Sequence, residues 1–215
     1  YIFCLVGLFG MRTLDAAAAA NPRALQALLI AAAFVIAGGI HYQTPMLATI
    51  ASEFQASPAA VGWIPTLSFG GMMIGVMFLV PLGDRISKRW LIIAMIGTLA
   101  SMQLVMAHAQ SIAVLAAASL VTGITSGVGL IFISIVVEIA PPEHRGRAVG
   151  TQLMAMFIGI LFARVMGGII AARYGWRTCY LMSTGLHIAL VAALDRKSTR
   201  LNSSHVSESR MPSSA

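Results

Sequence analysis

The stretch VPLGDRISKR at residues 80–89 decides the fold of this chain. It places one acidic and three basic side chains, Asp84, Arg85, Lys88 and Arg89, in a short turn, although charged residues make up only 10% of the sequence. Long apolar runs lie on both sides of the turn. Because an ion is costly in hydrocarbon, the turn has to lie at a membrane surface between two spans. Its basic residues favour the cytoplasmic surface.

The composition independently indicates a membrane protein. Hydrophobic residues make up 58% of the 215 residues, which leaves too little polar surface for a soluble globule. The net charge of +7 resides at span ends and in the C-terminal tail, not on one aromatic-studded face, so we expect no nucleic-acid partner. Cys4 and Cys179 lie in apolar segments without metal-ligand spacing, and we expect no metal, disulfide or cofactor.

Six apolar runs are long enough to cross a bilayer, and short connections join them. Since lipid offers no hydrogen-bond partners to the backbone, the runs are predicted to form antiparallel helices. They lack the apolar–polar alternation of barrel strands. The predicted fold is therefore an all-α membrane protein with a six-helix bundle over residues 24–194. The runs are Ala24–Ile50, Val61–Leu82, Trp90–Ala107, Ile112–Val137, Ala148–Ala172 and Thr178–Leu194.

The distribution of Lys and Arg predicts the orientation. Two of the basic residues near the span ends, Arg173 and Arg177, fall on one side. Seven fall on the other side, and the excess marks that side as cytoplasmic. Residues 1–23 are then a cytoplasmic segment, and the protein is expected in the cell (inner) membrane. The seven are Arg12, Arg23, Arg85, Lys88, Arg89, Arg145 and Arg147.

Both ends of the chain look foreign to the bundle. Met11 makes a more natural start than Tyr1, so residues 1–10 are expected to be upstream translation or a truncation edge. After Leu194 the apolar run stops in mid-span, and residues 195–215 are polar and Ser-rich. This tail resembles a translated sequencing adapter. We expect it to be disordered and non-native, the alternative being an ordinary cytoplasmic tail.

The charged turn resembles the signature between the second and third helices of the major facilitator superfamily, Gly-x-Leu-Ala-Asp-Arg-x-Gly-Arg-Arg. The matching residues are Leu82, Gly83, Asp84, Arg85, Lys88 and Arg89, and Val80 and Ser87 replace its two glycines. The resemblance implies that the turn is a conformational switch whose contacts change between inward- and outward-open states. The alternative is that its basic residues only anchor the topology.

The fifth run is similar to a pattern of drug–proton antiporters in that superfamily, Gly-x8-Gly-x3-Gly-Pro-x2-Gly-Gly. This chain has Gly150, Gly159, Ala163, Arg164, Gly167 and Gly168 at those positions. The resemblance implies proton-coupled efflux of a drug- or sugar-like molecule. Small residues at this spacing also simply allow close helix packing. The fourth run lacks the arginine of such antiporters, so any proton coupling must use other residues.

Arg164, in place of the pattern's proline, is the strongest candidate for a functional residue. An intramembrane Arg ordinarily faces a watery cavity or a partner. It could hold an anionic substrate group or a proton-carrying carboxylate. It lies nine residues before Arg173, roughly 13 Å along a helix. The alternative is therefore a side chain that snorkels to the outer surface.

A polar cluster of His41, Tyr42, Gln43 and Thr44 interrupts the first run just before Pro45. Facing a central cavity, these residues could contact substrate or relay a proton, since His titrates near physiological pH. At the outer membrane interface they would have no such role. The sequence agrees with either location of the cluster, at the central cavity or at the outer membrane interface.

The resemblance covers residues 20–194, the N-terminal half of a twelve-helix transporter whose other half would be a partner. A channel or structural membrane protein is the alternative function. We expect no enzyme, since motifs for nucleophiles, phosphates and metals are missing. Glu138, Glu143 and His144 are the only candidates for a catalytic cluster.

Overall fold

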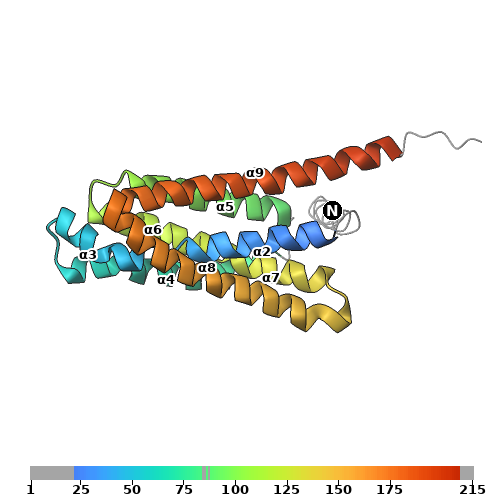
Figure 1. The fold of residues 1–215 in the computed structure, drawn as a ribbon, viewed down its shortest axis with the longest axis horizontal. Helices are drawn as coiled ribbons and strands as arrows, with labels where there is room; N and C mark the ends of the chain where they lie inside the picture. Colours follow the sequence, from blue (N-terminus) through green and yellow to red (C-terminus); the bar gives the residue numbers. More distant parts are fainter. Residues whose placement is uncertain (1–21, 84–85, 87, 209–215) are drawn as a thin grey trace, which may run out of the picture.

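The computed structural model describes residues 22–83, 86 and 88–208, which form helices joined by short connections (Figure 1). Six segments of this part are long and apolar enough to cross a membrane, and they are called spans 1 to 6. They confirm the predicted all-α membrane fold. The spans are Gln26–Glu53, Pro58–Leu79, Trp90–Ala107, Ile112–Ile139, Pro142–Tyr174 and Trp176–Leu194.

Spans 1 and 4 each consist of two helices. Span 1 contains α2 (Pro22–Gly38) and α3 (Gln43–Glu53), and span 4 contains α6 (Ile112–Ser126) and α7 (Val128–Ile139). Glycines lie at both interruptions, in keeping with their low cost for backbone that leaves the helix. The other spans lie in α4 (Pro58–Leu82), α5 (Lys88–Ala107), η1 (Pro142–His144) with α8 (Arg145–Tyr174), and α9 (Trp176–Glu208).

The last helix differs from the sequence expectation. The sixth apolar run ends at Leu194, where we expected a disordered tail, but α9 continues to Glu208 (Figure 1). Adding residues to an existing helix costs far less than nucleating one, so a polar segment can continue a membrane span. The origin of residues 195–215 stays a prediction, and residues 209–215 lie outside the described part.

Helices α4 and α6 touch backbone to backbone. A Cβ atom added to Gly75 would lie 2.0 Å from the carbonyl oxygen of Ile124, and one added to Gly123 would lie 2.0 Å from that of Ser68. Real Cβ atoms do not approach backbone so closely. Glycine on both helices is therefore what lets spans 2 and 4 pack at this distance.

Helix α8 packs against span 1 through the small residues of the fifth-run pattern. A Cβ on Gly159 would lie 2.3 Å from the carbonyl oxygen of Phe34, and the buried Ala163 lies against Gly38. Gly150 is different, since a Cβ there would meet nothing within 4 Å. The pattern thus contains positions that hold the helices together and one that does not.

Lys88 ties α5 to α7 at one end of the bundle. Its ammonium forms an ion pair with Glu138 and donates a hydrogen bond to the Ser134 hydroxyl at 3.5 Å. Lys88 is the first residue of α5, the helix that follows the charged turn, and Glu138 lies near the end of span 4. The ion pair therefore joins two connections far apart in sequence.

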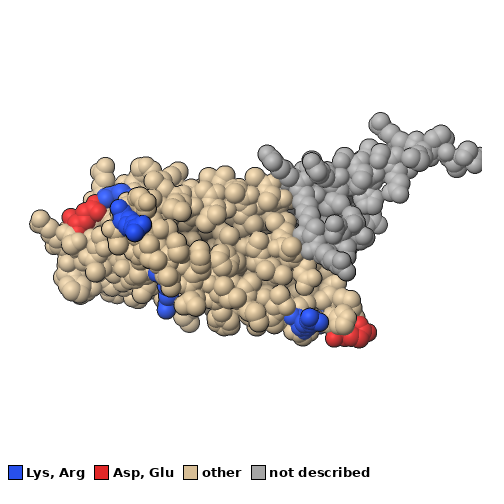
Figure 2. Space-filling view, viewed as in Figure 1, with Lys and Arg blue, Asp and Glu red and all other residues tan. Residues whose placement is uncertain are grey.

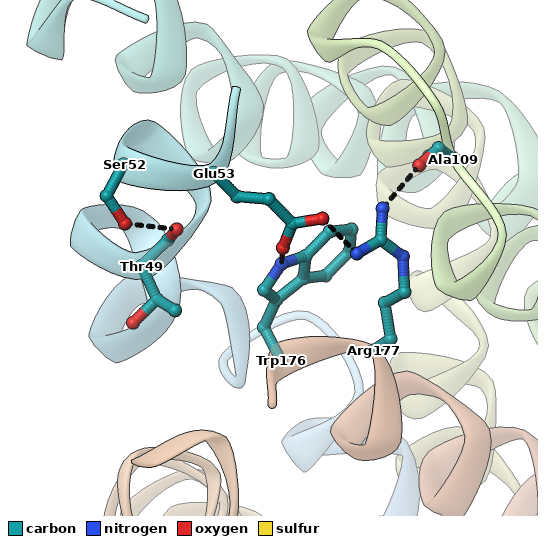
Figure 3. A network of polar contacts seen from close by, with 6 residues as sticks. All are labelled: Thr49, Ser52, Glu53, Ala109, Trp176 and Arg177. Atoms are coloured by element: carbon teal, nitrogen blue, oxygen red, sulfur yellow. Dashed lines mark hydrogen bonds and ion pairs between the residues drawn. The ribbon is translucent and has the colours of Figure 1, made fainter. Parts of the chain in front are cut away.

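A second polar network closes the opposite end (Figure 3). Glu53, at the end of α3, accepts hydrogen bonds from the Trp176 indole and the Arg177 guanidinium. Arg177 also donates to the Ala109 carbonyl at 3.1 Å and lies 4.3 Å from the centre of the Trp176 ring. This network connects spans 1 and 6 to the connection between spans 3 and 4.

The charges leave a long uncharged band between the two ends. On the face shown in Figure 2, acidic and basic side chains lie together at each end of the described part, and one basic patch on the edge interrupts the otherwise uncharged stretch between them. Such a band is expected for a surface in contact with hydrocarbon.

Gly159→Ala tests the contact between α8 and α2. The new methyl group meets the Phe34 backbone, so we expect a loss of about 1–3 kcal/mol of stability. Gly150→Ala is the matched control, because it gains helix propensity of up to about 1 kcal/mol without a clash. Thermal unfolding of the purified variants in detergent measures both. Equal melting temperatures would contradict the described packing.

Trp176 should contribute far more to stability than the charges beside it. Glu53 and Arg177 side chains are 41% and 40% exposed, so Glu53→Gln should cost at most about 1 kcal/mol. Trp176 is 1% exposed, and Trp176→Ala should cost about 3–5 kcal/mol. Denaturation of the two variants in detergent compares them. A larger loss from Glu53→Gln would contradict this ranking.

Candidate functional site

The break in span 1 is the most polar point of the bundle interior. Residues 39–42 form a turn in which the Gly39 amide donates to the Ile36 carbonyl and the His41 amide to the Gly38 carbonyl. In a membrane every backbone carbonyl freed by such a break needs a donor from the protein. Two side chains supply donors to the remaining carbonyls.

His41 and Gln103 are these two donors. The His41 Nδ1 lies 2.8 Å from the carbonyl oxygen of Ala37, one helical turn earlier, and a carbonyl can only accept, so Nδ1 holds the hydrogen. The Gln103 amide, from α5, donates to the Gly39 carbonyl at 3.1 Å. One role of His41 is therefore to complete the hydrogen bonding of span 1.

The ring of His41 also lies between side chains of two other spans. It meets the Phe69 ring of α4 edge to face, with 5.9 Å between the ring centres. The Arg164 guanidinium of α8 is near enough to interact with the imidazole electrostatically. The structure thus brings together two of the residues that the sequence singled out. We call His41, Thr44, Phe69 and Arg164 the His41 surface.

The exposed members of the His41 surface line the side on which α3 lies between α4 and α8. Thr44, Phe69 and Arg164 are exposed, while His41 is half-buried. Helix α3 contacts both neighbouring helices. The His41 surface thus takes residues from spans 1, 2 and 5.

Arg164 points away from the packed face of its helix. The small residues Gly159, Ala163 and Gly167 face span 1, whereas Arg164 is exposed beside Leu161 and Val165. Within the part of the chain that the structure describes, Arg164 forms no hydrogen bond or ion pair, and His41 is its electrostatic neighbour.

Gln43 and Tyr42 contact other helices instead of the exposed surface. Gln43 donates to the Ser68 hydroxyl at 2.8 Å, and Ser68 in turn donates to the Ser119 carbonyl at 3.2 Å. The Ser119 hydroxyl closes the network by donating to the side-chain Oε1 of Gln43 at 3.5 Å. Tyr42 packs against Gly167. Of the four residues in the predicted cluster, Tyr42 and Gln43 thus pack against other helices, and His41 and Thr44 belong to the His41 surface.

Sequence reasoning missed Gln103, Ser68, Ser119 and Phe69. Three of them are single polar residues inside long apolar runs, and all three are buried. That isolation was the signal available, since a polar group in a span needs a partner. Which partner each one finds depends on how the spans pack, and the sequence alone does not specify it.

The charged turn lies partly outside the described residues. Asp84 and Arg85 are not described, Arg89 lies in the first turn of α5, and Lys88 pairs with Glu138. The switch role of these four residues remains a prediction. Of the enzyme candidates, Glu138 is in that ion pair, while Glu143 and His144 are exposed in η1. In the described part, no group of three His, Cys, Asp or Glu side chains could hold a metal ion.

The other glycines of the fifth-run pattern differ in whether they contact the beginning of α3. A Cβ on Gly168 would lie 3.6 Å from the Pro45 ring, an ordinary contact, and Gly167 lies near Tyr42. Gly150 has no such neighbour. These contacts agree with a packing role, and the antiporter role of the pattern stays a prediction.

Comparison with known proteins connects this arrangement to a family. The chain is 35% identical to an uncharacterized transporter of Escherichia coli O157:H7, YgaY, over 82% of its own length and 44% of the relative's. It is 27% identical to two transport-related proteins of Escherichia coli K12, each matched over 40% of its length. They are the 3-(3-hydroxy-phenyl)propionate transporter, over 80% of this chain, and Multidrug resistance protein D, over 72%.

The chain therefore spans less than half the length of these relatives. The family model described as Major Facilitator Superfamily matches residues 29–212, which include all of spans 2 to 6 and most of span 1. Six apolar helices agree with the N-terminal half of such a transporter. This multi-pass membrane chain belongs to the Major Facilitator Superfamily.

Proposed function

We propose that this chain is the N-terminal half of a secondary active transporter and that the His41 surface forms its share of the substrate site. The observation that carries the proposal is Arg164, an exposed cation on an apolar helix that interacts electrostatically with the imidazole of His41. Facing lipid, such a residue would cost several kcal/mol. Facing a watery cavity between two halves, it would be free to bind a substrate.

The exposed apolar surfaces of α4 and α8 support the proposal that a second six-helix half packs against this chain. In the most apolar windows of spans 2 and 5, only 28% and 22% of residues are buried, against 50% and 56% in spans 1 and 4. Large apolar side chains such as Met73 and Met77 on α4 and Phe157 and Leu161 on α8 are exposed. A C-terminal six-helix half would cover these faces on both sides of the His41 surface.

The electrostatics favour a substrate with an acidic group. Arg164 offers a guanidinium, whose planar set of donors suits a carboxylate, and Phe69 offers an aromatic edge or face. The relative named for 3-(3-hydroxy-phenyl)propionate transports a compound with both features. The sequence predicted a drug- or sugar-like molecule, and an acidic aromatic member of that range fits the His41 surface best.

The direction and the coupling ion complete the proposal. The fifth-run pattern supports efflux in exchange for protons, and the lysine and arginine count supports a cytoplasmic N-terminus in the cell (inner) membrane. The charged turn at Asp84, Arg85, Lys88 and Arg89 would then face the cytoplasm as the conformational switch. The Lys88–Glu138 ion pair is one contact in this region that could break and re-form.

Arg164→Ala should abolish transport of an acidic substrate. The test uses the full-length transporter that contains this sequence, reconstituted in proteoliposomes with labelled 3-(3-hydroxyphenyl)propionate and, separately, the cationic drug ethidium. We expect transport of the acid to fall at least about tenfold, since one charge-assisted hydrogen bond contributes roughly 1.5–3 kcal/mol. Arg164→Lys should retain part of the activity.

Arg173→Ala is the matched control, because Arg173 lies exposed in the last turn of the same helix. Its transport rate should equal that of the unaltered protein. Acid transport that is unchanged in Arg164→Ala, or ethidium as the only molecule transported, would contradict the proposed site. Flux that follows the concentration gradient without any coupling would instead favour a channel.

A further inference from the structure

His187 lies within span 6, on α9, and is fully buried among helices. Its Nδ1 is 2.7 Å from the carbonyl oxygen of Ser183, one turn earlier in α9. Because a carbonyl only accepts, Nδ1 holds the hydrogen of the neutral imidazole. The other nitrogen, Nε2, is then a bare acceptor, and it has no hydrogen-bond partner among the described residues.

Gln103, whose side chain also reaches Gly39, presents a second bare acceptor. Its amide nitrogen is used by the Gly39 carbonyl, so its Oε1 points elsewhere, and this buried oxygen also lacks a partner in the described part. Unpartnered buried polar atoms are rare because each one costs free energy. Two acceptors together cannot satisfy each other, since neither has a hydrogen to donate.

The two side chains meet at the break of span 1. The Gln103 amide nitrogen lies 3.2 Å, and the His187 Cε1 lies 3.3 Å, from the position that a Cβ on Gly39 would occupy. Gly39 is therefore the residue that leaves room for them. A proton added to Nε2 of His187 would turn one of the two acceptors into a donor.

We propose that the Nε2 of His187 is a proton-binding site of the transporter, with Oε1 of Gln103 as the acceptor that stabilises the bound proton. The proton would come from water and bond to the lone pair of Nε2, which converts imidazole into imidazolium. Deprotonation would return it to water on the other side. This inference rests on the proposed function, because it identifies the group that carries the coupling proton.

The groups around His187 explain how proton binding would couple to a conformational change of the transporter. Between Gln26 and Gly38 on α2, and between Trp90 and Ala107 on α5, the sequence contains no titratable side chain. On the other packed elements, the described titratable side chains lie either at the ends of the bundle or nearer the break. Glu53 of α3 pairs with Arg177 of α9 at one end, and Arg145, Arg147, Arg173 and Tyr174 lie in the first and last turns of α8. The others are His41 and Tyr42 at the break, Arg164 on α8, and Cys179 and Tyr180 on α9.

Glu53 is the carboxylate among these described side chains, and it pairs with Arg177 at the end of the bundle, so a buried imidazolium at His187 would lack a counter-ion. It would be favoured only in a conformation that lets water reach the site. Proton binding would thus favour opening, and opening would favour proton binding. The protonation state of His187 would also affect the break in span 1, because Gln103 donates a hydrogen bond to the Gly39 carbonyl there.

Nitrogen NMR of the chain in lipid bilayers tests the site without any transport assay. The protein is labelled with ¹⁵N-histidine, and the His187 signals are assigned by their loss in His187→Gln. At about pH 8 we expect a protonated Nδ1 and an unprotonated Nε2. Because burial without a counter-ion disfavours the imidazolium, we expect protonated Nε2 only as the pH falls well below about 5. Gln103→Leu should weaken proton binding at His187 about tenfold, since it removes a charge-assisted hydrogen bond.

His108 is the matched control, because its Nδ1 makes the same bond to the carbonyl one turn earlier, at 3.0 Å, but its side chain is exposed. Its nitrogen signals should not differ between the unaltered protein and Gln103→Leu. An Nε2 of His187 that stays unprotonated throughout would overturn the proposal and indicate a bound water as the donor. So would a titration that Gln103→Leu leaves unchanged. Neither result depends on whether the protein transports anything.

Discussion

The rule that a membrane-embedded backbone must satisfy its own hydrogen bonds governs this structure. Most spans obey it by remaining helical, but span 1 leaves the helix at residues 39–42. His41 and Gln103 restore the missing donors at the carbonyls of Ala37 and Gly39. Because those donors come from the break itself and from span 3, the polar centre of the bundle can form only once the spans have packed.

Small residues determine how near the spans come to that centre. Glycines on α4 and α6 bring two backbones into contact, and Gly159 does the same for α8 and α2. In α8 the small residues also determine where Arg164 points, since they assign one face of the helix to span 1 and leave the other exposed. One face of α8 thus packs against span 1, and another face carries Arg164 of the proposed substrate site.

The sequence was sufficient for the spans, the fold class and the family, because these follow from apolar length and from motifs within single segments. It also identified His41 and Arg164, which the structure brings within range of electrostatic interaction. It could not separate Gln43 from Thr44, although they are neighbours, because burial depends on the other spans. It overlooked Gln103 and His187 for the same reason: their significance comes from meeting at Gly39, far away in sequence. The continuation of α9 beyond Leu194 differed from expectation, since apolar length marks the end of a span but not of a helix.

Accessibility of the two ends of span 4 tests the membrane topology most directly. In a background of Cys4→Ser and Cys179→Ala, Gln110→Cys and Glu143→Cys each place one thiol in an exposed connection at opposite ends of α6 and α7. Intact cells are treated with a thiol reagent that does not cross membranes. The account predicts labelling of the Gln110→Cys variant alone, with the Glu143→Cys variant labelled only after the cells are opened. Labelling of both variants in intact cells would contradict a membrane crossing between them.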